Sequence, residues 1–169
     1  LKAATALAAE FAARMDAAPG RNLVVAFDGY ATADWPRMIN LLSQQLRLRN
    51  IGLEAADFRA AFKSGQEIRD LIDPLLEWDR EKDPTLLYGR IFRGGYEALL
   101  DEANAEDFRL RIAALRSSDD TRRVVAVYGS GCLMPRMRDL YDVRCYFDVT
   151  PKESILRIRR GQYANLGDR

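Results

Sequence analysis

The run LVVAFD, residues 23–28, most limits what this 169-residue chain can fold into. Its first five residues are apolar, it is rich in β-branched side chains, and Gly29 follows it. A continuous apolar run of strand length is typical of a central parallel strand that is buried on both faces. Three further segments predict strands: a weaker one at 51–58, a buried one at 122–131 that ends in a Gly turn, and one at 143–149.

Helical patterns lie between these strands. Segments 1–17 and 105–116 read as helices, and Pro36 suits the first turn of a helix that runs to about Arg49. Ser64 and Glu67 have the spacing of a capping box, and Thr150 before Pro151 marks another helix start. Strands that alternate with helices predict an α/β three-layer sandwich with a mostly parallel sheet. In such folds ligands bind where loops leave the carboxyl ends of strands.

Composition excludes several classes of function. The formal net charge is +1, so we expect no nucleic-acid partner and no membrane partner. The chain has no histidine, and Cys132 and Cys145 form no CxxC pair, so we expect no metal site. Reduced cysteines predict a cytoplasmic location. We expect residues 1–21 to form an N-terminal helix and turn, and residues 22–169 to form one α/β domain that is part of a longer chain.

The segment after the first strand has the layout of a phosphate-binding loop with altered residues. A Walker A loop has a Gly, four residues, then Gly-Lys and a Ser or Thr, with Lys on the phosphates and the hydroxyl on Mg²⁺. With Gly29 as the first Gly, Asp34 takes the second Gly position, Trp35 the Lys position and Pro36 the hydroxyl position. Each change removes a phosphate or metal contact, and an ordinary strand–turn–helix is the simpler interpretation of this segment alone.

A longer stretch resembles a known family. RRVVAVYGSGCLMPRMRDLYDVRCYFDVTPKESILRIRRG, residues 122–161, resembles the second half of uridine kinase and its P-loop kinase relatives. In those proteins a strand ends in an acid–Gly pair, and a helix later carries an Arg-rich lid. VVAFDG resembles the strand before their P-loop, and AAFKSGQEI resembles their DSFYK stretch. The layout is also similar to kinase-like domains that are fused to mannose-6-phosphate-isomerase-like cupins.

The resemblance implies a P-loop kinase-like fold, ATP and Mg²⁺ as cofactors, and a set of site residues. The acid before the Gly of the later strand falls on Tyr128. The acid that would activate the acceptor hydroxyl falls on Ala60, and Asp57, three residues earlier, is the candidate that would replace it. The implied phosphate or nucleotide contacts fall on Asp28, Gly29, Asp34, Trp35, Arg157, Arg159 and Arg160.

Two residue patterns allow more than one interpretation. Arg90 and Arg93, in YGRIFRGG, are candidates to bind an anionic acceptor, or they lie in a surface turn. The basic residues near 157–160 are a lid clamp, or a solvated helix end that complements the helix dipole. YGSGCLM resembles a GxGxxG loop, but Met134 stands where its third Gly would be, which disfavours a dinucleotide site.

The leading hypothesis is a degenerate uridine kinase-like domain with weak or no phosphotransfer and a structural or regulatory role. It would take a nucleotide or sugar-phosphate ligand and act with a fused or associated domain. The alternative is an active ATP-dependent kinase for a nucleoside or sugar, with a non-standard phosphate site. A third hypothesis is an oligomerisation or protein-interaction domain. Whether the chain is an enzyme stays open at this point, because the Walker A lysine is missing.

Overall fold

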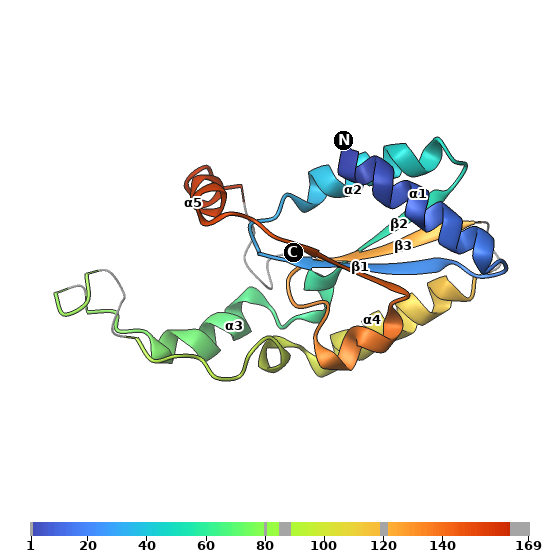
Figure 1. Ribbon diagram of the computed structural model, residues 1–169. Helices are drawn as coiled ribbons and strands as arrows, with labels where there is room; N and C mark the ends of the chain where they lie inside the picture. Colours follow the sequence, from blue (N-terminus) through green and yellow to red (C-terminus); the bar gives the residue numbers. More distant parts are fainter. Residues whose placement is uncertain (1, 80, 85–88, 119–121, 163–169) are drawn as a thin grey trace.

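A parallel four-stranded sheet forms the centre of the described part of the chain (Figure 1). The computed structural model describes residues 2–79, 81–84, 89–118 and 122–162. The strand order is β2-β3-β1-β4, and every pairing is parallel. The strands are β1 (Leu23–Gly29), β2 (Gly52–Asp57), β3 (Arg123–Tyr128) and β4 (Val143–Phe147). All four carboxyl ends therefore lie at one edge of the sheet.

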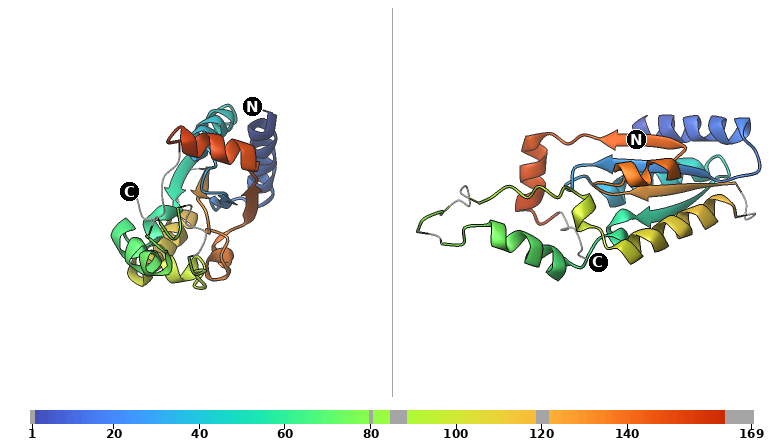
Figure 2. Two further views of the ribbon diagram at one scale, coloured as in Figure 1. Left: turned by 90° about the vertical axis from the view of Figure 1, so that its left-hand side faces the viewer. Right: turned by 90° about the horizontal axis from the view of Figure 1, so that it is seen from below.

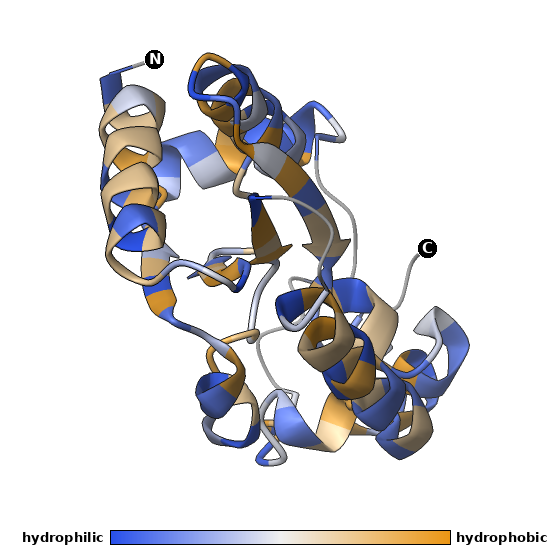
Figure 3. Ribbon diagram, turned by 90° about the vertical axis from the view of Figure 1, so that its right-hand side faces the viewer, coloured by the Kyte–Doolittle hydropathy of each residue, from blue (hydrophilic) through white to orange (hydrophobic). Residues whose placement is uncertain are grey.

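Helices cover both faces of the sheet, which confirms the predicted three-layer α/β fold (Figures 1 and 2). Helices α1 (Lys2–Ala17) and α2 (Trp35–Arg47) pack on one face, and α4 (Glu102–Arg116) packs on the other. Val24 and Ala26 of β1 join the core on the α4 side, whereas Val25 and Phe27 join the core on the α1 side. Because both faces are covered, every residue of β1 is buried, as its continuous apolar run predicts. In Figure 3 the strands are mainly hydrophobic and lie between the helical layers.

Several shorter elements lie at or beyond the carboxyl edge of the sheet (Figure 1). They include helix α3 (Gly65–Ile72) with the 3₁₀ turns η1 (Phe58–Ala61), η2 (Asp73–Leu75) and η3 (Glu97–Leu99). The 3₁₀ turn η4 (Pro135–Leu140) joins β3 to β4. Helix α5 (Pro151–Arg159) follows β4 and lies across the end of the sheet. No helix in the described ranges is long and apolar enough to cross a membrane.

The predicted helix starts are confirmed, with one shift. Ser64 and Glu67 form the full capping box of α3, and Thr150 caps α5 by accepting the Glu153 N–H. Helix α4 begins at Glu102, three residues before the predicted start, because Asp101 provides an N-cap. Pro36 lies in the first turn of α2, as predicted.

Three of the predicted strands end earlier than expected, whereas β1 continues one residue further, to Gly29. The strand expected over 122–131 ends at Tyr128, because Gly129 has φ +132° and turns the chain. The strand expected over 143–149 ends at Phe147. Between α3 and α4, residues 85–88 lie outside the described residues, and η3 precedes α4.

Gly29 gives a test of the packing between β1 and β4. A Cβ atom at Gly29 would lie 2.4 Å from the Phe147 carbonyl oxygen, which is backbone and cannot rotate away. We expect Gly29→Ala to lower the free energy of unfolding by about 2–3 kcal/mol, in the range of an overpacked core. Urea unfolding followed by circular dichroism measures this.

Gly52→Ala is the matched control in β2. Its Cβ would lie 3.6 Å from the Arg123 side chain and 3.8 Å from the Arg122 carbonyl oxygen, which are ordinary contacts. We expect a change within about 0.5 kcal/mol, and a stabilising sign is acceptable because glycine is unfavourable in strands. If both variants lost the same free energy of unfolding, the close contact between Gly29 and the Phe147 carbonyl would not be what limits the side chain at Gly29.

Candidate active site

The start of α2 is where a phosphate loop presents its backbone N–H groups. Here the Trp35 N–H donates to the carbonyl two residues back at 2.9 Å, and Pro36 has no N–H. The Arg37 N–H donates to the Asp34 carboxylate at 3.2 Å, and the Met38 N–H donates to the Asp34 carbonyl at 3.0 Å. The first four positions of α2 therefore have no unpaired N–H, and a carboxylate of the chain itself lies where a phosphate would bind.

The Trp35 indole covers the carboxyl ends of the central strands. Its ring contacts Tyr128 with a centroid separation of 6.2 Å and Phe147 at 6.0 Å, the latter edge-to-face at 68°. Phe147 in turn packs edge-on against the buried Phe27 at 5.7 Å. Each such pair adds about 0.5–1.5 kcal/mol beyond its buried area. The indole is thus held by aromatic packing at the position of the Walker A lysine, and it carries no positive charge.

The Asp28 carboxylate is used by the backbone around it. Oδ1 accepts the N–H groups of Gly29 at 2.7 Å and Gly131 at 2.9 Å, and Oδ2 accepts the Leu133 N–H at 2.8 Å. Asp28 is buried, and these bonds join the end of β1 to the loop after β3. Gly29, paired with Phe147 and buried, leaves no room for a side chain. Asp28 and Gly29 therefore have structural roles at the strand ends that do not depend on a ligand.

A cavity of about 390 Å³ lies at the carboxyl edge of the sheet, and we call it the cleft. Residues from the ends of β2 and β3, from the start of α2 and from the end of α5 line it. Its volume suits a small ligand. The residues that line it are Ala31, Ala33, Asp34, Trp35, Pro36, Asp57, Arg59, Tyr128, Gly129, Ser130, Arg157, Gly161 and Gln162.

Asp57 and Arg59 form a close ion pair within the cleft. Asp57 ends β2, and its Oδ2 accepts from Arg59 Nε at 2.9 Å and Nη2 at 2.6 Å. Its Oδ1 accepts the Arg59 backbone N–H at 2.9 Å. Burial raises the pKa of the neighbouring Tyr128 phenol, and the charge and hydrogen bond of Asp57 raise that pKa further. Tyr128 is therefore a neutral hydrogen-bonding group at pH 7, unlike the acid that the resemblance would place there.

Arg157 reaches the cleft from α5, and its guanidinium already has partners. Nη1 donates to the Thr32 carbonyl at 2.8 Å, and Nε pairs with Glu153 one turn back at 2.8 Å. Beside this contact, the Thr32 hydroxyl donates to the Ser154 hydroxyl at 2.9 Å. Helix α5 is thus docked on the loop between β1 and α2.

The other predicted arginines are not brought to the cleft. Arg159 is the last residue of α5 and Arg160 follows it, and both side chains are exposed. Arg90 donates to the Pro74 carbonyl on the surface, and Arg93 is exposed. Arg59, which also lines the cleft, was not predicted from the sequence. The only signal for it was its place two residues after Asp57, near the end of the strand predicted over 51–58.

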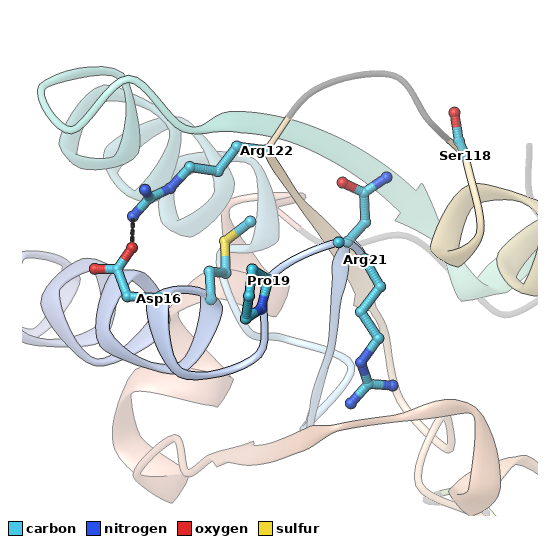
Figure 4. Close-up of a pocket in the computed structure, with 8 residues that line it drawn as sticks. Asp16, Pro19, Arg21, Ser118 and Arg122 are labelled. Carbon is cyan, nitrogen blue, oxygen red and sulfur yellow. Dashed lines mark ion pairs between the residues drawn. The ribbon is translucent and has the colours of Figure 1, made fainter.

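A larger cavity of about 450 Å³ lies at the opposite, amino edge of the sheet (Figure 4). Its charged side chains are neutralised within the chain: Arg122 pairs with Asp16 at 2.6 Å, and Arg21 pairs with Asp142 at 3.1 Å. We therefore place the candidate site at the cleft, where strand ends and a helix terminus converge. Among the described residues, no group of three or more His, Cys, Asp or Glu side chains could hold a metal ion.

A family model described as a domain of unknown function, DUF8485, matches residues 4–169. The chain belongs to the DUF8485 family. No curated protein shows significant sequence similarity to it.

The fold of this DUF8485 domain is similar to that of a "putative fructose transport system kinase" from Silicibacter sp. TM1040. The TM-score is 0.63 and the sequence identity is 16%, over 94% of this chain and 81% of the other. At this identity the likeness shows the fold alone, an α/β fold with helices on both faces of a parallel sheet. Rif2 of Saccharomyces cerevisiae aligns at a TM-score of 0.40 and 12% identity, over 86% of this chain and 54% of its own. A structure of Rif2 in complex with the Rap1 C-terminal domain aligns at a TM-score of 0.42 and 12% identity, over 85% of this chain and 52% of the other.

The contacts of Asp28 generate a stability prediction. In Asp28→Asn an amide NH₂ group must replace one of the two carboxylate oxygens, so it faces an N–H group that needs an acceptor. We expect the free energy of unfolding to fall by about 2–4 kcal/mol, because buried charge-assisted hydrogen bonds are lost and one donor is left unpaired. Denaturant unfolding at pH 7 measures the loss.

Asp139→Asn, at an exposed position in η4, is the control and should change stability by less than about 0.5 kcal/mol. If Asp28→Asn is as mild as this control, the Asp28 carboxylate does not hold the two loops together.

Proposed function

We propose that this domain is a degenerate P-loop kinase-like module, with weak or no phosphotransfer and a structural or regulatory role. The observation that carries the proposal is the start of α2. No backbone N–H there is left for a phosphate, Asp34 supplies a competing negative charge, and Trp35 stands where the lysine would be.

The charges of the cleft support the same proposal. Its two acids, Asp34 and Asp57, are balanced by its two bases, Arg59 and Arg157, and each base is already paired within the chain. A triphosphate needs an excess of positive charge or a metal ion to offset its own charge. Removing one preorganised charge partner costs phosphoryl transfer about 3–4 kcal/mol. Here the lysine, the hydroxyl and the free N–H groups are missing together.

The proposed role follows from what the fold keeps. The sheet, the helix after the first strand and the docked α5 persist without the phosphate contacts, so the domain retains a ligand-sized cleft. We propose that residues 22–169 act as a module that binds a small ligand such as a sugar phosphate. We further propose that the module regulates or supports a fused or associated domain, in line with the resemblance to kinase-like domains joined to cupins.

Isothermal titration with ATP and MgCl₂ tests this proposal. We expect no saturable heat for the wild-type domain at micromolar ATP. We expect the triple variant Asp34→Gly, Trp35→Lys, Pro36→Ser to gain measurable Mg²⁺-dependent binding, because it restores a free helix start and a lysine. Wild-type binding in the micromolar range that requires Mg²⁺ would overturn the proposal.

The single variant Asp34→Gly is the matched control. It frees one N–H group and removes one carboxylate, but it supplies no cation. We expect at most weak binding from it, and circular dichroism should show both variants folded. Equal ATP affinity in the single and triple variants would mean that the indole is not the main obstacle.

The second candidate is an active ATP-dependent kinase for a sugar or nucleoside. Asp57 favours it, because this acid lies in the cleft at the end of β2, where it could accept a proton from an acceptor hydroxyl. The similarity to a structure described as a fructose transport system kinase supports a sugar acceptor. An active kinase would need another lysine in place of the missing Walker A lysine. Lys63 does not supply it, because its ammonium donates to the carbonyls of Ala98 and Leu100.

A coupled assay for ADP release over a panel of hexoses and nucleosides tests the second candidate. If the domain is an active kinase, Asp57→Asn should lower kcat at least about 100-fold, as expected for a lost general base. The control Asp107→Asn, on the exposed side of α4, should leave the rate unchanged. No turnover with any acceptor would reject this candidate and leave the leading proposal standing.

A further inference from the structure

A second hollow lies beside the cleft, and it is mainly apolar. It has a volume of about 240 Å³ and runs between α1, α2 and the end of β4; we call it the groove. Leu7 comes from α1, Met38 and Leu41 from α2, and Phe147 and Val149 from the end of β4 and the residues after it. Because three separate elements form its walls, the groove is part of the tertiary structure and not a dent on one helix.

Four charged residues line the groove, and two of them are already bound to other groups of the chain. Asp34 and Arg157 also line it, but Asp34 caps α2, and Arg157 is bound to Glu153 and to the Thr32 carbonyl. The side chains of Arg37 and Asp148 are exposed and form no hydrogen bond or ion pair with any residue that the structure describes. The groove therefore offers one guanidinium and one carboxylate that are available to a ligand.

We propose that the groove binds a free amino acid with a hydrophobic side chain, of the size of leucine or phenylalanine. The apolar walls accept the side chain, Arg37 pairs with the α-carboxylate and Asp148 pairs with the α-ammonium. A zwitterion matches two opposite charges at once, whereas a fatty acid or an alkylamine would leave one of them unmatched. The small volume favours a ligand of this size over a drug-sized molecule. This site is independent of whether the cleft binds ATP.

Phe147 connects the groove to the cleft. Its ring lines the groove and also packs against Trp35, with the ring centroids 6.0 Å apart. A ligand that presses on Phe147 should therefore change the surroundings of the Trp35 indole. Trp78, the other tryptophan, is exposed and lies in a different part of the chain, so the variant Trp78→Phe isolates the Trp35 fluorescence.

The experiment titrates the Trp78→Phe domain with three probes that share the isobutyl side chain of leucine. They are L-leucine, 3-methylbutylamine, which lacks the carboxylate, and 4-methylpentanoic acid, which lacks the ammonium. Binding is followed by Trp35 fluorescence and by calorimetry. We expect saturable binding of leucine, and binding of each of the other two about tenfold weaker, because each has lost one charged contact.

Two charge-removing variants give each contact its own signature. Arg37→Gln should lower the affinity for leucine about tenfold, and this variant should bind leucine and 3-methylbutylamine with equal affinity. Asp148→Asn should lower the affinity for leucine by a similar factor, and this variant should bind leucine and 4-methylpentanoic acid with equal affinity. Arg47→Gln, an exposed arginine in the last turn of α2, is the matched control and should leave all three affinities unchanged. All three positions are exposed, so the variants should fold like the parent, which circular dichroism checks.

Three results would overturn the proposal. They are no saturable leucine binding at millimolar concentration, equal affinity of the wild type for all three probes, and equal effects of Arg37→Gln and Arg47→Gln. Tighter binding of leucinamide than of leucine would also overturn it, because it would indicate the amino terminus of a peptide as the occupant. None of these results bears on ATP binding at the cleft, so the two proposals fail separately.

Discussion

The carboxylate of Asp28 organises the carboxyl edge of the sheet. It lies at the end of the central strand β1, and it takes three backbone N–H groups from its own strand end and from the loop after β3. A buried carboxylate is stable only when such donors surround it, so the loops on both sides must keep one geometry. That geometry sets the distance between β1 and β3 where the cleft opens, and it aligns Gly29 for its close contact with Phe147.

The segment that resembles a phosphate loop is closed by its own hydrogen bonds. In an open loop, the free N–H groups of a helix start attract an anion from solution. In this chain the Trp35 N–H donates to the carbonyl two residues back, and Pro36 has no N–H. Asp34 accepts the next two N–H groups of the helix, one on its carboxylate and one on its carbonyl. The internal carboxylate gives α2 the stabilisation that a bound phosphate would otherwise supply, and it does so without ligand. The helix start can then serve packing, and the row of rings from Phe11 through Phe27 and Phe147 to Trp35 makes it part of the core.

The cleft and the groove divide the chemistry of this edge. The charged side chains of the cleft are bound within the chain, whereas the mainly apolar groove leaves two opposite charges exposed. The two hollows share Ala33, Asp34 and Arg157, and Phe147 contacts the indole that lines the cleft. A ligand in one hollow therefore touches residues of the other.

The sequence by itself determined the elements of this protein, because each depends on local pattern. The apolar run 23–28 predicted the buried strand, the Ser64–Glu67 spacing predicted a capped helix, and the residues at 34–36 predicted the loss of the lysine and the hydroxyl. Tertiary structure alone decided which charges meet. It brought Asp57, Arg59 and Arg157 to one cleft and left Arg90, Arg93, Arg159 and Arg160 outside the cleft. Sequence spacing could not show this, because the contacts of a long, flexible arginine depend on which acids and carbonyls the packed helices and loops place within its reach.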